Sequence, residues 1–191
     1  MSPDRAQRLR LFFALWLPPG VGEPLLSAAQ ALVVGSARVV AAIDLHVTLC
    51  FLGAVEQSVL AVLCERVAAF EAQAFELEFD QLQCWPRSRV LVASSSQVPQ
   101  AASALAAALQ SSARAAGLAP AAQSLAPHVT LLRGVQAAAM AQFVPLSPPL
   151  RLKAQTFYLA QSHALESATA TPLQTARYRR LAAWPLSAAG S

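Results

Sequence analysis

The stretch AAIDLHVTLCFLG, residues 41–53, decides the fold, because its apolar and β-branched run predicts a buried strand with one histidine, His46, set into it. The tetrapeptide His-Val-Thr-Leu occurs again in SLAPHVTLLRGV, residues 124–135, where it begins at His128. The chain has three histidines, so two of them share one four-residue context. We interpret this recurrence as an internal repeat, which predicts two matching half-sites.

Each copy of the motif places an imidazole beside a hydroxyl. Successive side chains of a strand point to opposite faces, so His46 projects with Thr48, and His128 projects with Thr130. An imidazole titrates near neutral pH and a hydroxyl can donate a hydrogen bond to an anionic oxygen, so the pair suits acid–base chemistry beside a phosphate. If the repeat brings both strands together, one imidazole can accept a proton while the other donates one. Phosphodiester cleavage by such a pair needs no metal ion.

The segments around the two motifs alternate between strand and helix patterns. Because each histidine strand follows a helix and other strand material, we predict an α+β fold of two pseudo-symmetric lobes. Each lobe is expected to be an antiparallel sheet with helices on its outer face, and the two sheets are expected to face each other across a central cleft. Residues 1–191 would form a single bilobal domain. Strands are predicted at 10–17, 39–43, 45–52, 75–80, 89–93, from 128, 150–161 and 178–186, and helices at 21–32, 57–70 and 99–116.

Composition predicts a cytoplasmic protein with no membrane span. Hydrophobic residues make up 55% of the chain, yet no apolar run reaches the roughly 18 residues that cross a bilayer. The first apolar run resembles a signal peptide, but Pro18-Pro19-Gly20 follows it at once and no small-residue cleavage site does. The spacing of the three cysteines fits neither a disulfide framework nor a Cys-x-x-Cys site, so they are expected to be reduced thiols: Cys50, Cys64 and Cys84.

Charge is distributed unevenly along the chain. Residues 1–80 carry five arginines and nine acidic residues, whereas residues 81–191 carry nine Lys and Arg residues and one acid, Glu166. A polyanionic ligand that meets mainly the C-terminal half would account for this asymmetry, and so would a solvated basic surface.

Two positions in the basic half are candidates for contact with RNA. Arg87 shares a strand face with Arg89, and Tyr178 lies within a cluster of three arginines that could grip a backbone while the ring stacks on a base. A solvated strand edge is an equally good interpretation of both.

Five stretches, in order along almost the whole chain, resemble one known family: RLFFALWLPP, LHVTLCFLG, PRSRVLV, PHVTLLRG and RYRRLAAWPL. They are similar to the bacterial and archaeal RNA 2′,3′-cyclic phosphodiesterases, also called 2′-5′ RNA ligase-like proteins, of the two-histidine (2H) phosphoesterase superfamily. The paired His-x-Thr motifs are the most specific part of this resemblance. It implies a bilobal α+β fold and hydrolysis of a 2′,3′-cyclic phosphate to a 2′-phosphate without a cofactor.

The resemblance also implies roles for individual residues. His46 and His128 correspond to the acid–base pair, and Thr48 and Thr130 correspond to phosphate ligands. We expect His128 to activate water and His46 to protonate the departing ribose O3′, although strand geometry does not decide this direction.

Two further roles are implied beside these. Arg133 corresponds to a phosphate-binding cation, and Phe13 to a stacking partner for a base. Strict alternation turns Arg133 away from His128, so its role requires the strand to end or bulge near Leu132 and Gly134.

The expected partner is an RNA with a 2′,3′-cyclic phosphate end, or a small cyclic nucleotide, bound by a monomer that has no metal site. Two alternatives stay open: an RNA- or nucleotide-binding module without turnover, and a 2H enzyme acting on another cyclic phosphate or on a 2′-5′ linkage. Two titrating groups and two hydroxyls favour an enzyme over a binding module.

Two other arrangements would give different chemistry. Alternation places Cys50 on the face of His46, which suggests a cysteine nucleophile, but the matching residue of the second copy is Leu132, which favours an apolar filler. His163, in the polar loop 162–177, would complete a three-histidine zinc site with the two motif histidines, although no helical spacing of ligands supports it.

Overall fold

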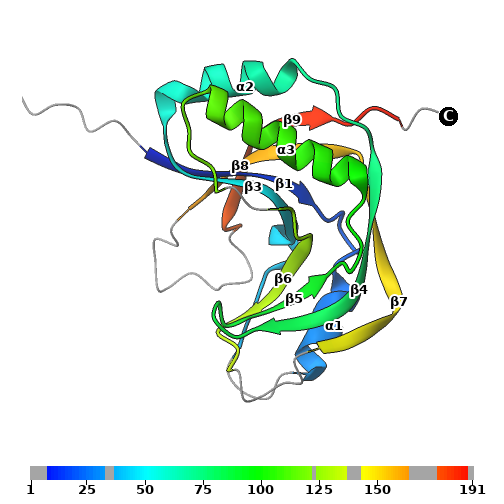
Figure 1. Ribbon diagram of the computed structural model, residues 1–191. Helices are drawn as coiled ribbons and strands as arrows, with labels where there is room; N and C mark the ends of the chain where they lie inside the picture. Colours follow the sequence, from blue (N-terminus) through cyan, green and yellow to red (C-terminus); the bar gives the residue numbers. More distant parts are fainter. Residues whose placement is uncertain (1–7, 33–36, 122–123, 137–142, 164–175, 189–191) are drawn as a thin grey trace, which may run out of the picture.

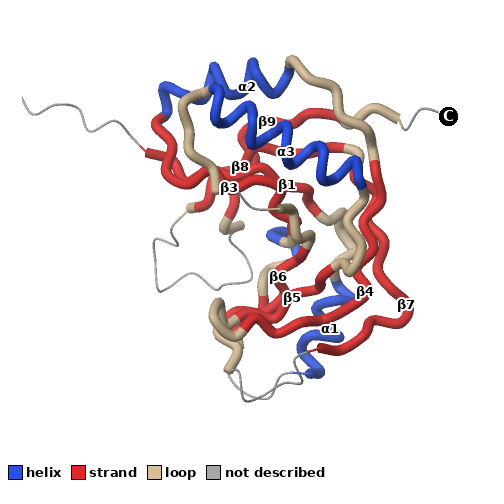
Figure 2. Tube along the Cα trace, in the orientation of Figure 1, coloured by secondary structure: helices blue, strands red, loops and turns tan. Residues whose placement is uncertain are grey.

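Strands are the most abundant secondary structure in the protein, whose structure is a computed structural model that describes residues 8–32, 37–121, 124–136, 143–163 and 176–188 (Figures 1 and 2). Three α-helices and two short 3₁₀ turns, Ala42–Asp44 and Gln57–Val59, accompany them: α1 is Glu23–Leu32, α2 is Leu60–Ala68 and α3 is Gln100–Ala115. The strands are β1 Arg8–Trp16, β2 Arg38–Val39, β3 His46–Glu56, β4 Phe75–Trp85, β5 Val90–Ser94, β6 His128–Arg133, β7 Phe143–Ala154, β8 Thr156–Ser162 and β9 Tyr178–Pro185.

The two histidine strands lie side by side at the centre of the sheet. Its order is β7-β4-β5-β6-β3-β1-β8-β9, with β2 paired to β6, and every pair of named strands is antiparallel. On either side of the centre, β6-β5-β4 corresponds to β3-β1-β8, as a duplicated unit requires. The expected α+β fold of antiparallel halves is confirmed, with one difference: the halves are hydrogen-bonded into one sheet, through the pair Val47 and Val129.

The helices are exchanged between the halves. α1 follows β1 in the chain but packs against β6, and α3 follows β5 but packs against β3. In Figure 1, α2 and α3 lie together over the half that contains β1, β3, β8 and β9, while α1 lies at the other half. Each half is thus covered by a helix that follows, in the chain, a strand of the other half.

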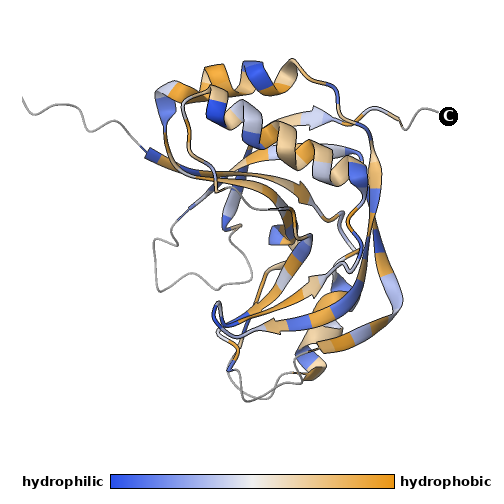
Figure 3. Cartoon of the chain, viewed as in Figure 1, coloured by the Kyte–Doolittle hydropathy of each residue, from blue (hydrophilic) through white to orange (hydrophobic). Residues whose placement is uncertain are grey.

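One hydrophobic core runs through both halves. It contains fully buried residues of β1, β4, β5 and the helices, among them Leu11, Leu77, Leu91, Leu63 and Leu105. Hydrophobic and hydrophilic residues are interleaved along the outer strands β4 and β7 (Figure 3), which is typical of a sheet with one face in the core and one in water. No helix of the described segments combines the length and apolar character needed to cross a membrane.

The region predicted as one strand at 150–161 is two strands: β7, which already begins at Phe143 and lies at one edge of the sheet, and β8, which lies between β1 and β9 on the other side. β7 contains Pro145, Pro148 and Pro149, which have no N–H to donate. They are accommodated because β7 is an edge strand, where one side needs no partner. The strand predicted at 39–43 is also shorter, since β2 ends at Val39 and a 3₁₀ turn follows.

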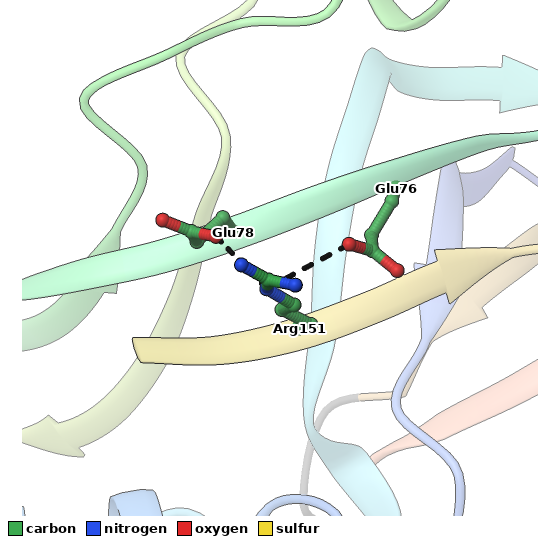
Figure 4. Close-up of polar contacts among 3 residues, drawn as sticks. All are labelled: Glu76, Glu78 and Arg151. Carbon is green, nitrogen blue, oxygen red and sulfur yellow. Dashed lines mark hydrogen bonds and ion pairs between the residues drawn. The ribbon is translucent and has the colours of Figure 1, made fainter. Parts of the chain in front are cut away.

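The acidic residues of β4 lie on its exposed face, as predicted. Arg151 of β7 lies between Glu76 and Glu78, with its Nε 3.8 Å and 3.0 Å from their carboxylate oxygens (Figure 4). All three side chains are largely exposed, so this cluster contributes about 1 kcal/mol or less to stability. The carboxylates therefore belong to a solvated sheet edge.

Candidate functional site

A cavity of about 760 Å³ opens where β3 and β6 meet, and it brings together the residues of both motifs. Its wall includes His46 and Thr48 from β3 and His128, Thr130 and Arg133 from β6. The two half-sites predicted from the repeat therefore face one space.

The register of the central strands explains this convergence. Val47 lies opposite Val129, and both are fully buried on the core face of the sheet. The residues on either side of each valine point to the opposite face, so all four motif side chains project into the cavity. In this register the two imidazoles occupy diagonal positions, which in a regular ladder lie roughly 7–8 Å apart, a spacing that one phosphoryl group can bridge.

A β-bulge in β6 turns Arg133 toward the cavity. Leu132 pairs with Leu91 and Thr130 pairs with Val92, which leaves Leu131 without a partner. Two consecutive buried residues result, Leu131 and Leu132, and the alternation shifts by one position after them. The bulge that the role of Arg133 required is therefore present.

β3 contains the same bulge at the same place. Cys50 pairs with Phe13 and Thr48 pairs with Ala14, which leaves Leu49 unpaired. Phe51 consequently lines the cavity at the position that corresponds to Arg133 of the second copy.

The cysteine nucleophile is contradicted by this bulge. Cys50 faces the core, with 5% of its surface exposed, and not the side of His46 that strict alternation predicted. Burial raises the pKa of its thiol to about 11, so no thiolate is available at neutral pH.

Both imidazoles are held in the same tautomer. Nδ1 of His46 is 2.6 Å from the carbonyl oxygen of Asp44, and Nδ1 of His128 is 2.8 Å from that of Ala126, two residues upstream in each copy. A carbonyl can only accept, so Nδ1 carries the hydrogen and donates it. Nε2 of each ring is left as the atom that gains or loses a proton.

Aromatic rings surround His46. Trp16 stacks on it at 5.1 Å, Phe12 lies at 5.1 Å and Tyr178 meets it edge-on at 4.7 Å. A bond of 2.9 Å from the indole N–H of Trp16 to the carbonyl of Ile43 fixes the stacked ring. Trp16 and Phe12 come from β1, the neighbour of β3 in the sheet, and Tyr178 comes from the edge strand β9.

Burial lowers the pKa of both imidazoles below the usual value of 6.5. For His46, burial among these rings is the largest cause, nearby Arg133 and His128 add to it, and the pKa falls to about 4. For His128, burial is again the largest cause; the hydrogen bond to the carbonyl of Ala126 opposes it and Arg133 adds to it, and Trp85 packs against the ring at 4.4 Å. In the free protein both histidines are therefore neutral near pH 7.

Phe13 cannot stack on a base, contrary to expectation. It is fully buried on the core face of β1, against Phe157 and Trp184. The neighbouring Phe12 points to the cavity side instead, but only 4% of it is exposed. Among the aromatic residues of the wall, Phe51 has an exposed ring, with 42% of its surface accessible.

The two candidate RNA contacts have different positions. Tyr178 lines the cavity, as proposed from its sequence context, together with the adjacent Arg177. Arg87 is exposed in the turn between β4 and β5 and lies outside the cavity wall, to which the same turn contributes Ser88. Arg180 points elsewhere and stacks on Trp16 and Tyr158.

His163 lines the cavity as an exposed residue, and its backbone N–H donates to the carbonyl of Arg177 at 3.0 Å. Within the described ranges, no three His, Cys, Asp or Glu side chains are grouped as a metal site requires, so a three-histidine site finds no support. The rest of the predicted loop, 164–175, lies outside the described residues.

Asp44 is a site residue that the sequence did not reveal. It is 5% exposed, and its carboxylate accepts the backbone N–H of Arg177 at 3.1 Å and 2.9 Å. Burial raises the pKa of this carboxyl, while the hydrogen bonds from Arg177 and Tyr178 oppose that rise. The main-chain carbonyl of Asp44 orients the ring of His46, and its side chain holds the start of β9, where Tyr178 lies. One residue therefore positions the rings of both His46 and Tyr178.

Comparison with known proteins agrees with this geometry. The family model described as LigT like Phosphoesterase matches residues 15–92. The RNA 2′,3′-cyclic phosphodiesterase of Escherichia coli (strain K12) is 35% identical over 144 residues, which make up 73% of this chain and 77% of that protein.

Solved structures extend the similarity to the whole fold. The crystal structure of E. coli LigT complexed with 3′-AMP matches with a TM-score of 0.81 at 29% identity, over 94% of this chain and 98% of that one. A protein of Thermus thermophilus matches in fold, with a TM-score of 0.72 at 23% identity over 93% and 98% of the two chains. With its paired His-x-Thr strands around one cavity, this chain belongs to the LigT-like phosphoesterase family.

Proposed function

We propose that the protein hydrolyses the 2′,3′-cyclic phosphate of RNA ends, or of nucleoside 2′,3′-cyclic phosphates, to a 2′-phosphate. The observation that carries this proposal is the pair of imidazoles, each with Nδ1 held by a carbonyl, that face one cavity beside two threonines and an arginine. The name of the E. coli relative, an RNA 2′,3′-cyclic phosphodiesterase, supports the same substrate.

In the proposed reaction, one neutral Nε2 accepts a proton from water as the water oxygen bonds to phosphorus. The bond from phosphorus to O3′ breaks in line, and the other imidazole protonates O3′. Thr48, Thr130 and Arg133 hold the non-bridging phosphate oxygens and stabilise the charge that builds up on them. The products are a free 3′-hydroxyl and a 2′-phosphate, and these side chains need no metal ion.

We assign water activation to His128 and O3′ protonation to His46. A bound phosphate raises the pKa of both imidazoles, because it opposes burial with an adjacent negative charge. Cation–π attraction to the faces of Trp16 and Phe12 then offsets part of the cost of burying an imidazolium at His46. A substrate with an activated leaving group, bis(4-nitrophenyl) phosphate, tests the assignment. His46→Ala should retain activity toward it, and His128→Ala should lose it; the reverse result would exchange the two roles.

The exposed ring of Phe51 is our candidate for stacking on the base of the terminal nucleotide, and Tyr178, also in the cavity wall, is a second candidate. The guanidinium of Arg10 lies 4.9 Å from the centre of the Phe51 ring and extends this surface with a positive charge. We further propose that the enzyme works as a monomer in the cytoplasm.

The decisive experiment is incubation with adenosine 2′,3′-cyclic phosphate and with an RNA that ends in a 2′,3′-cyclic phosphate, with and without a chelator. We expect 2′-phosphate products, undiminished by chelation and abolished in His46→Ala and His128→Ala. Loss of turnover on chelation would contradict metal-free chemistry. Tight RNA binding without any product would favour the binding module, and turnover only of another cyclic phosphate or of a 2′-5′ linkage would change the substrate.

A further inference from the structure

A second cavity, of about 520 Å³, adjoins the first and shares part of its wall. Arg133, Arg177, Ser88 and Val90 border both spaces. Arg38 and Arg89 line only the second, and no acidic side chain of the described segments lines it. Four guanidinium groups therefore surround a space that adjoins the proposed catalytic centre.

Two of these arginines stand directly opposite each other. In the antiparallel pair of β2 and β6, Arg38 is the register partner of Arg133. Like charges at such positions repel and destabilise the sheet, unless an anion lies between them. Among the described residues neither guanidinium has an ion pair or a hydrogen bond, so no described side chain neutralises this pair.

The other two arginines show further signs of a built anion site. Nε of Arg177 is buried and has no hydrogen-bond partner, a state that costs free energy until a ligand supplies an acceptor. Arg89 has a φ of 53°, in the left-handed region that arginine seldom adopts. Backbone hydrogen bonds to Pro86 and from Val135 hold it there, at the edge of the cavity.

We propose that this second cavity binds the internucleotide phosphate of an RNA chain, the one on the 5′ side of the nucleotide that carries the cyclic phosphate. This inference rests on the proposed function. Arg133, which borders both cavities, would lie between two successive phosphates of one strand. Basic grooves that follow a backbone, beside aromatic rings that hold bases, are the usual means of binding single strands. The subsite makes RNA ends, in preference to free cyclic nucleotides, the substrate class.

The test compares three substrates: adenosine 2′,3′-cyclic phosphate, the same nucleotide with a 5′-phosphate, and the dinucleotide ApA ending in a 2′,3′-cyclic phosphate. Only the last carries an internucleotide phosphate. We expect its kcat/KM to exceed that of adenosine 2′,3′-cyclic phosphate about tenfold or more, since hydrogen bonds to a charged partner have about this effect on affinity.

Two variants each remove one guanidinium group from the second cavity: Arg38→Ala and Arg89→Gly. Glycine is chosen at position 89 because it adopts the left-handed conformation without strain. Each should lower kcat/KM for the dinucleotide about five- to tenfold and leave that of adenosine 2′,3′-cyclic phosphate within twofold. Arg87→Ala is the matched control, because it removes an arginine from the same turn that lines neither cavity. This variant should leave kcat/KM unchanged for both the dinucleotide and adenosine 2′,3′-cyclic phosphate.

The outcomes separate the two proposals. If no substrate is turned over, the proposed function fails. If all are turned over at similar rates, or if Arg38→Ala and Arg89→Gly lower all of them equally, the function stands and the subsite is overturned. If kcat/KM exceeds that of adenosine 2′,3′-cyclic phosphate only for the 5′-phosphorylated nucleotide, the cavity binds the phosphate of a free nucleotide. The proposed preference for an RNA chain is then wrong.

Discussion

At the scale of single residues, the surroundings of the two imidazoles determine how the reaction depends on pH. In the free protein the pKa values of His46 and His128 both lie below 6.5, and that of His46 is about 4. A bound phosphate raises both. One imidazole must be protonated and the other neutral, so both profiles are bell-shaped. Since kcat/KM reports the free protein and kcat the complex, we expect the optimum of kcat/KM at a lower pH than that of kcat. Rates for adenosine 2′,3′-cyclic phosphate between pH 4 and 9 check this, and coinciding optima would contradict it.

The same burial links His46 to stability. An unfolded histidine binds a proton near pH 6.5, but His46 in the folded protein does so only near 4. Between these values the unfolded chain binds more protons, so the free energy of unfolding falls as pH falls from 6.5 toward 4. We expect His46→Asn, which keeps an N–H for the carbonyl of Asp44, to flatten this dependence in urea titrations at several pH values. An unchanged slope would show that His46 is not the group responsible.

Asp44 gives a third prediction. Asp44→Asn leaves the carbonyl that orients His46 but turns an amide toward the backbone N–H groups of Arg177 and Tyr178, so it should cost about 1–3 kcal/mol of stability and displace Tyr178. Urea unfolding and the activity assay measure both effects. Asp80→Asn is the control: its carboxylate also accepts a backbone N–H, from Ser96 at 3.0 Å, but at an exposed position where the loss should be under about 1 kcal/mol. Equal losses in the two variants would contradict a special role for Asp44.

The sequence reveals these residues unequally, for physical reasons. The motif pairs are visible because a strand's period of two puts His and Thr together. Phe13 was assigned wrongly, because β1 is apolar on both faces and its sequence does not show which face meets the cavity. Asp44 gives no local signal, since the backbone that it binds lies 133 residues away.

At the scale of elements, the paired bulges decide which side chains reach the cavity. Deleting Leu131 should remove the bulge in β6 without turning Arg133, because Leu132 and Arg133 keep their partners Leu91 and Val90, so a folded deletion variant should retain activity. Leu131→Val keeps the bulge and should cost only about 1 kcal/mol with activity retained. Because the deletion also threatens folding, Arg133→Ala provides the independent measurement: it should remove activity in a folded protein. Activity in that variant would exclude Arg133 from phosphate binding.

Helices and strands are predictable from sequence where the periodicity of neighbouring residues determines them. Both histidine strands and all three helices follow from periodicity, with ends within a few residues. The edge strand β7 does not, because its three prolines indicate a loop until the sheet order shows that one side of it needs no partner.

At the scale of the whole molecule, the uneven charge has a measurable consequence. The arginines of the two cavities come from both ends of the chain, and no acidic residue of the described segments lines either space. Binding of RNA should therefore release counterions, and its KM should rise steeply with salt. We expect a steeper rise for an RNA oligonucleotide than for adenosine 2′,3′-cyclic phosphate when KCl is increased from 50 to about 300 mM. Equal slopes would show that only one phosphate is bound.

The exchange of helices between the halves bears on how the polypeptide folds during synthesis. The half built around β3 needs α3 and the last strands, β8 and β9, before its sheet and cover are complete. The half built around β3 can therefore be completed only after all the strands of the other half have been synthesised. The catalytic pocket would form only after β9 has left the exit tunnel, so a truncated product lacking β9 should be inactive and a substrate for proteases.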